Sequence, residues 1–131
     1  MKNARVAPPL AGNVIEADSF VIAEWRDKGA LSGPPQWIAP LHLHRNDDEA
    51  WYVLEGTLNV LVGSEEIEAQ AGASVVVPRG TPHTYRNPGP GPVRYLLVMT
   101  PTIHRLIEAL HSGARDDYAQ VFLEHDSELL V

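Results

Sequence analysis

The sequence of 131 residues contains no cysteine. Without thiols the chain has no disulfide, no thiolate metal site, no iron–sulfur ligation and no cysteine nucleophile. Any metal site must therefore be built from nitrogen and oxygen ligands. The six histidines of the sequence are the natural source of the nitrogen.

Basic residues and long apolar runs are also scarce. Ten Lys and Arg face seventeen Asp and Glu, which gives a formal net charge of −7. Because binding to a phosphate backbone needs clustered basic side chains, we expect no nucleic-acid partner. Nowhere do about 18 apolar residues run together, as a membrane-spanning helix requires. The apolar stretch near the N-terminus is too short and too proline-broken for a signal peptide. We therefore expect no membrane partner and a soluble, cytoplasmic protein.

Glycine and proline are plentiful, with ten and eleven copies, and they divide the chain into short β-rich segments. So many breakers favour short strands over long helices. At least eight strands without intervening helices predict an all-β barrel or sandwich. The expected strands span residues 19–25, 37–44, 49–55, 57–62, 66–70, 74–77, 81–86 and 93–100.

After residue 101 the pattern becomes helical. A first helix is expected with Thr102 as its cap and Gly113 as its stop, and a second over residues 116–124. The first helix carries an apolar stripe at positions i, i+3, i+4 and i+7. Its members are Ile103, Leu106, Ile107 and Leu110. We expect these helices to cover the outside of the sheet. The whole chain, 1–131, is expected to be one domain, with a barrel core over 14–100 and a helical tail over 102–125.

His42 and His44 lie one residue apart on a predicted strand, so both side chains leave the same face. Two imidazoles on one face can bind a common ion, although such a pair is more often surface or core. Glu49 follows five residues later, where an antiparallel neighbour would return opposite the histidines. The alternative is that Glu49 is an ordinary loop acid beside Asp47 and Asp48.

A second cluster changes this balance. The chain reads Gly72, five residues, Pro78-x-Gly80, two residues, His83, three residues and Asn87. Together with the first cluster, this resembles the two motifs of the cupin superfamily. The first motif is present as His42-x-His44, Glu49 and Gly56, with Gln36 where the family has glycine. The departure at Gln36 concerns the local backbone and not the ligand positions.

The resemblance implies a cupin-type double-stranded β-helix, or jelly-roll barrel, followed by two short C-terminal helices. It implies one divalent transition metal ion, which could be Fe, Mn, Ni, Co, Cu or Zn. The implied ligands are His42, His44, Glu49 and His83. Three imidazoles and one carboxylate form a borderline site that leaves positions open for water or substrate.

The single-domain form with a helical tail is similar to the quercetin-dioxygenase-like cupins. The leading hypothesis is therefore a metal-dependent oxidoreductase, dioxygenase-like, acting on a small organic substrate, with Glu49 as a base if it leaves the metal. By alternation Trp51 and Tyr85 point inward and could line a substrate pocket, although each is also an ordinary core residue.

Two other functions stay open. One is a non-catalytic cupin module that binds a small molecule. The other is a metal-dependent isomerase of a sugar or keto acid, for which Tyr85 is the candidate acid–base residue. Family members commonly form homodimers, and the strand at 19–25 could pair with a partner or within the chain.

Several aromatic and histidine residues receive only a general assignment. His104, His111 and His125 have no neighbour at ligand spacing and are expected on the solvated surface. Trp25 and Trp37 are expected to pack in the core or to lie on a dimer surface. On the last strand, residues 93, 95, 97 and 99 share a face, but the sequence does not say whether it points inward.

Overall fold

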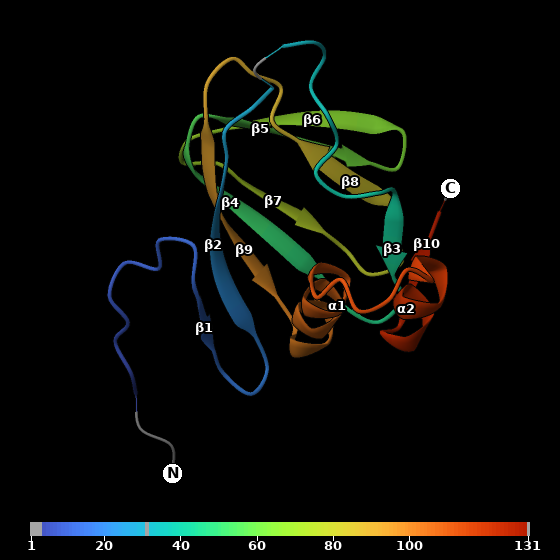
Figure 1. Ribbon diagram of the computed structural model, residues 1–131. Helices are drawn as coiled ribbons and strands as arrows, with labels where there is room; N and C mark the ends of the chain where they lie inside the picture. The colour runs from blue at the N-terminus through green and yellow to red at the C-terminus, as the bar shows by residue number, and fades with distance from the viewer. Residues whose placement is uncertain (1–3, 31, 131) are drawn as a thin grey trace.

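The computed structural model describes residues 4–30 and 32–130; residues 1–3, 31 and 131 of the expected domain lie outside the described residues. Two five-stranded antiparallel sheets face each other, which confirms the all-β prediction (Figure 1). In spatial order the first sheet contains β1 (Val14–Glu16), β2 (Val21–Asp27), β9 (Val93–Met99), β4 (Glu49–Glu55) and β7 (Ser74–Val77). The second contains β10 (Ser127–Leu129), β3 (His42–His44), β8 (His83–Arg86), β5 (Thr57–Val62) and β6 (Glu65–Gln70).

The core lies between the sheets and follows the alternation of each strand. Along β9 every second residue is buried, so the inward face is now settled. Its members are Val93, Tyr95, Leu97 and Met99. Trp51 and Val53 of β4 pack against them from the neighbouring strand. The period of two therefore determines which side chains form the core.

The strand expected over residues 37–44 is present only as β3. Trp37 forms an isolated bridge to Arg86, and the amide of Ile38 donates to the carbonyl of Tyr85 at 2.8 Å. Pro40 has no amide hydrogen, so a regular ladder cannot continue through it. At Gln36 the backbone φ is not positive, so glycine is not required there.

The connection from β3 to β4 differs from the expected hairpin. β3 pairs with β8 and β10, whereas β4 pairs with β7 and β9 in the facing sheet. The polar residues 45–48 therefore cross from one sheet to the other. Glu49 reaches the histidines from the opposite wall and not from a neighbouring strand.

The N-terminal strand is intrachain. β2 pairs with β1 on one side and, over its full length of seven residues, with β9 on the other. Of the two alternatives for the segment at 19–25, the structure contains the pairing within the chain.

The tail forms α1 (Pro101–His111), α2 (Tyr118–Glu124) and the unexpected strand β10. Thr100, not Thr102, caps α1 by accepting from the amide of Ile103 at 3.2 Å, and Pro101 occupies the first helical turn. The expectation that the helices cover the outside of the sheet is wrong. Ile103 joins the main core, and the helices lie at an open end of the barrel (Figure 1). Within the described residues, neither helix has the length and hydropathy to span a bilayer.

Gly56 forms the corner at which the chain leaves β4 for β5. Its φ is +79°, a left-handed conformation that side chains disfavour. A Cβ at this position would lie 2.3 Å from the carbonyl oxygen of Pro92, so only glycine fits.

We predict that Gly56→Ala destabilises the fold by about 3 kcal/mol or more, because left-handed strain and a backbone clash add together. Gly63→Ala is the matched control: φ is +62° there, but nothing lies within 4 Å of the added Cβ. It should cost about 1 kcal/mol. Urea unfolding of both variants measures the difference, and equal costs would contradict the close approach to Pro92.

Candidate metal centre

The four expected ligands meet at one end of the barrel. His42 and His44 come from β3, His83 opens β8 beside His42, and Glu49 opens β4 in the facing sheet. One ligand atom from each lies within 4.8 Å of the others, and all four residues are buried. Ligand atoms about 2.1 Å from one ion are at most about 4.2 Å apart, so the set is near binding geometry.

The Nδ1 atoms of the three rings are all occupied. His42 Nδ1 lies 2.6 Å from the Pro40 carbonyl oxygen, and His83 Nδ1 lies 2.9 Å from that of Thr81. His44 Nδ1 lies 2.8 Å from Ser127 Oγ. Since carbonyls only accept, Nδ1 carries the proton in His42 and His83. The Nε2 atoms of these two rings then have free lone pairs, as metal ligation requires.

The Nε2 atoms face Glu49 at short range. Glu49 Oε1 lies 2.8 Å from His83 Nε2 and 3.3 Å from His44 Nε2. His44 Nε2 is buried and makes no hydrogen bond. A carboxylate oxygen and a ring lone pair repel each other unless a proton or a metal cation lies between them. The buried cluster therefore fits a metal ion.

Burial sets the charge of the ligands. Desolvation, aided by the neighbouring His83, lowers the pKa of His42 to about 4. Burial alone would raise the pKa of Glu49, but hydrogen bonds and positive charge from the His44 and His83 imidazoles, when their Nε2 atoms are protonated, outweigh it and lower that pKa to about 2. At neutral pH His42 is neutral and Glu49 is ionised, which are the forms that bind metals.

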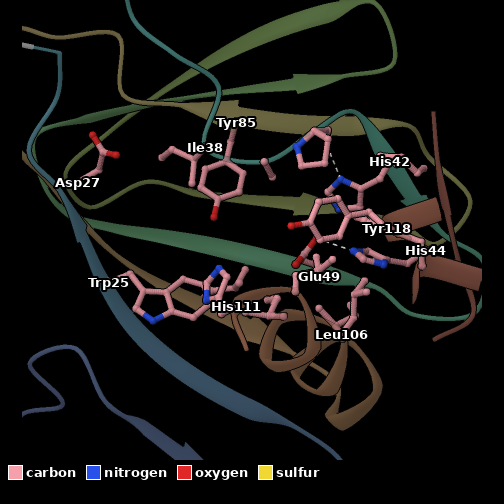
Figure 2. A pocket seen from close by; sticks show the side chains of 18 of the residues that line it. Trp25, Asp27, Ile38, His42, His44, Glu49, Tyr85, Leu106, His111 and Tyr118 are labelled. Atoms are coloured by element: carbon pink, nitrogen blue, oxygen red, sulfur yellow. Dashed lines mark hydrogen bonds and ion pairs between the residues drawn. The ribbon is translucent and has the colours of Figure 1, made fainter. Parts of the chain in front are cut away.

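A cavity of about 570 Å³ opens onto the cluster, with His42, His44 and Glu49 on its wall (Figure 2). Tyr85 lines this cavity and points its hydroxyl into it. Trp51 does not: it is 1% exposed and packs behind the wall, with its ring centroid 5.8 Å from that of His83. Most of the remaining wall is apolar and includes Leu97, Ile103, Leu106, Ile107, Leu110 and Phe122.

The three remaining histidines are less uniform than expected. His111 is exposed, yet it lies at the cavity wall. His104 is half-buried, and its Nδ1 lies 3.5 Å from Glu16 Oε1. His125 is half-buried, with Nδ1 2.7 Å from the Val121 carbonyl oxygen. The expectation of a solvated surface is therefore wrong for His104 and His125.

Sequence reasoning missed several residues of the site. Trp25 lines the cavity and meets Tyr95 edge-on at a centroid distance of 6.5 Å. The hydroxyl of Tyr95 donates to that of Tyr85 at 3.3 Å. For Tyr95 the alternation of β9 was the available signal, whereas nothing in the sequence pointed to Ser127.

Comparison with known proteins identifies the family to which the chain belongs. Residues 32–99, slightly more than half of the chain, match the cupin domain family. The chain is a cupin. This match contains all four ligand positions and ends before the helices and β10.

Individual relatives of this cupin are distant. An uncharacterized protein of Methanocaldococcus jannaschii, MJ1618, is 33% identical over 97 residues, which are 66% of this chain and 78% of that protein. Quercetin 2,3-dioxygenase of Bacillus subtilis is 38% identical over 82 residues, 63% of this chain but only 23% of the enzyme. A cupin structure from Bacteroides fragilis aligns with a TM-score of 0.61 at 16% identity, covering 92% of this chain and 95% of that one. This last likeness shows the fold alone.

We predict that His42→Ala and His83→Ala each weaken metal binding by more than about 100-fold, because each removes one of four ligands. His111→Ala is the control, since His111 lies at the cavity wall outside the ligand cluster. Elemental analysis of protein purified without added metal, followed by chelator competition, measures the effect. Metal content that survives both ligand substitutions would refute the site.

Proposed function

We propose that this cupin is a metal-dependent oxidoreductase of the dioxygenase type, acting on a small, largely apolar organic substrate with an enolisable oxygen. The observation that carries the proposal is that three of the four clustered residues, His42, His44 and Glu49, line a largely apolar cavity. The cavity of about 570 Å³ is within the range that holds drug-sized molecules. The sequence similarity to a quercetin dioxygenase supports the same reaction class.

A divalent ion in this ligand set would act as a Lewis acid toward an anionic substrate oxygen. Dioxygen would be the oxidant, with both of its atoms entering the product, so no separate reductant is required. The chain itself supplies an apolar wall from α1 and α2, which would limit the access of water to the reacting group. Glu49, with its pKa near 2, is a weak base while it contacts His44 and His83. Proton abstraction by Glu49 would require it to leave them.

The tyrosine pair supports binding of a second substrate oxygen. The Tyr95 hydroxyl donates a hydrogen bond to the Tyr85 hydroxyl. Among the described residues no hydrogen-bond acceptor is found for the Tyr85 hydroxyl. Burial raises the pKa of Tyr95 to about 12 and that of Tyr85 well above its usual value of 10. Both phenols therefore stay protonated near neutral pH. Tyr85 can donate a hydrogen bond into the cavity, but it is poorly suited to be the base of an isomerase.

The wall disfavours sugar phosphates. Arg26 is the arginine on it within the described residues, and its side chain is 60% exposed and 4.0 Å from Glu55. A phosphate needs several buried donors, and sugar hydroxyls need partners that leucine and isoleucine side chains do not provide. An aromatic or diketone substrate with few oxygens matches the wall better.

We predict oxygen uptake when the metal-loaded protein meets a suitable member of a flavonol and diketone panel, at a turnover on the order of 1 s⁻¹ or faster. His42→Ala is the control and should show no uptake above background. Loading with Fe, Mn, Ni, Co and Cu in turn tests which ion supports the reaction.

Thermal denaturation in the same panel distinguishes the alternatives. A rise in melting temperature without oxygen uptake or any other turnover would indicate a module that only binds its ligand. A metal-saturated protein inert toward every enolisable substrate would contradict the dioxygenase proposal. Conversion of a keto acid or sugar without oxygen consumption would favour an isomerase.

We also propose that the protein is a homodimer. The strand registers place Val76, Ala50, Val98 and Ile22 in one row across the outer face of the first sheet. Val76 is 65% exposed, and the side chain of Tyr52 beside it is 42% exposed. A contiguous apolar face of this kind is typical of an interface between protein chains.

Sedimentation velocity should therefore give twice the chain mass of 14.4 kDa. Val76→Glu should shift the protein toward the monomer, because the interface would then bury a charge. Leu123→Glu, on an exposed position of α2, is the matched control and should leave the dimer intact. A wild-type monomer at micromolar concentration would refute the dimer.

A further inference from the structure

The C-terminal strand β10 completes the sheet edge beside β3. Ser127 pairs with His44, and Leu129 with His42. Further backbone bonds hold both ends of the pairing: Leu130 N donates to Leu41 O at 2.9 Å, and Arg45 N donates to Asp126 O at 2.8 Å. β10 lies beyond the residues 32–99 that match the cupin family, yet it is in direct register with two metal ligands.

Ser127 brings a hydroxyl to the far side of the His44 ring. Its side chain is fully buried, and Oγ lies 2.8 Å from His44 Nδ1. The same Oγ donates to the carbonyl oxygen of His125 at 2.9 Å. A serine hydroxyl has one proton, so Oγ must accept the proton of His44 Nδ1. His44 Nε2 is then left with a free lone pair that faces the other ligand atoms.

His44 differs in this respect from the other two ligands. His42 and His83 each contact a carbonyl two residues earlier, that of Pro40 and of Thr81. Those contacts form within one loop, whereas the partner of His44 comes from 83 residues further along the chain. The orientation of His44 therefore depends on the tail in a way that the other two rings do not.

We infer that Ser127 is a positioning residue that holds His44 in the Nδ1-protonated tautomer and so completes the metal site from the C-terminal strand. The inference rests on the proposed metal centre, but not on the reaction that the metal supports. The Nε2-protonated tautomer of His44 also has an acceptor nearby. Glu49 Oε1 lies 3.3 Å from His44 Nε2 and would accept a hydrogen bond from it. Without Ser127 the buried Nδ1–H has lost its acceptor, so the proton moves to Nε2 and blocks the lone pair.

Ser127→Ala should weaken Zn²⁺ binding by about 10- to 100-fold, the usual effect of losing a hydrogen-bond partner behind a metal-bound histidine. Ser127→Thr keeps the hydroxyl and should restore most of the affinity. Ser74→Ala, on an exposed position of β7, is the matched control and should bind Zn²⁺ like the wild type. Competition with a chromogenic chelator measures all four dissociation constants.

The tautomer is read directly by long-range ¹H–¹⁵N correlation spectra of the histidine rings in metal-free protein. We expect the Nδ1–H form of His44 in the wild type and in Ser127→Thr, and the Nε2–H form in Ser127→Ala. A wild-type His44 in the Nε2–H form would overturn the inference without any variant. So would weaker Zn²⁺ binding by Ser127→Ala with an unchanged His44 tautomer, since that would indicate a purely structural role.

The outcomes also separate this inference from the proposals on which it stands. If wild-type protein does not bind Zn²⁺ at all, the metal centre and the inference both fail. If Ser127→Ala behaves as expected but the metal-loaded wild type never consumes oxygen, the dioxygenase proposal fails and Ser127 keeps its role.

Discussion

Three imidazole rings and one carboxylate converge on a single buried point between two sheets, and this convergence is unfavourable unless positive charge lies within it. Glu49 Oε1 is 2.8 Å from His83 Nε2, and both residues are buried. An uncompensated charge there would cost several kcal/mol. The backbone carbonyls behind His42 and His83 strengthen this requirement, because they hold the ring protons on the outer nitrogens. A cation at the centre therefore satisfies several buried groups at once.

The topology follows from the need to bring ligands from both walls to that point. The chain changes sheets several times, and the crossings between β3 and β4 and between β7 and β8 lie next to residues of the cluster. Packed sheets are about 10 Å apart, so side chains from facing strands can meet midway. His42 and His83 are register partners in one sheet, and Glu49 closes the set from the other. The cavity beside the cluster is lined by residues of both sheets and of both helices.

The sequence predicted which four residues cluster better than it predicted the path of the chain between them. The period of two placed His42 and His44 on one face, and the spacing around Pro78 and Gly80 brought His83 inward, as the structure confirms. The predicted hairpin between His44 and Glu49 was wrong. A four-residue connection can either close a hairpin or cross to a facing sheet. Only long-range pairing with β7 and β9 decides between the two, and a local pattern carries no such information.

In the C-terminal tail, too, the local sequence pattern did not predict the long-range contacts. The apolar stripe of α1 correctly predicted a helix with one buried face, but periodicity does not say what covers that face. The start of α1 could have been placed better, because proline is favoured in the first helical turn and Pro101 is followed by a regular stripe. Ser127 had no signal at all. It is one small residue in a strand of three, and its importance comes from pairing with His44.

The barrel and the tail contribute different parts of the site. All four residues of the candidate metal cluster lie within the residues that match the cupin family, whereas much of the cavity wall, including Ile103, Leu106, Leu110 and Phe122, lies beyond them. A set of three imidazoles and one carboxylate limits which ions it could bind and therefore which chemistry it could support. The apolar wall favours molecules with few polar groups, because each polar group that is desolvated in the cavity without a hydrogen-bond partner costs free energy. Since β10 pairs with β3 and its Leu129 lines the cavity, one short strand contacts both the cavity and the strand that carries His42 and His44.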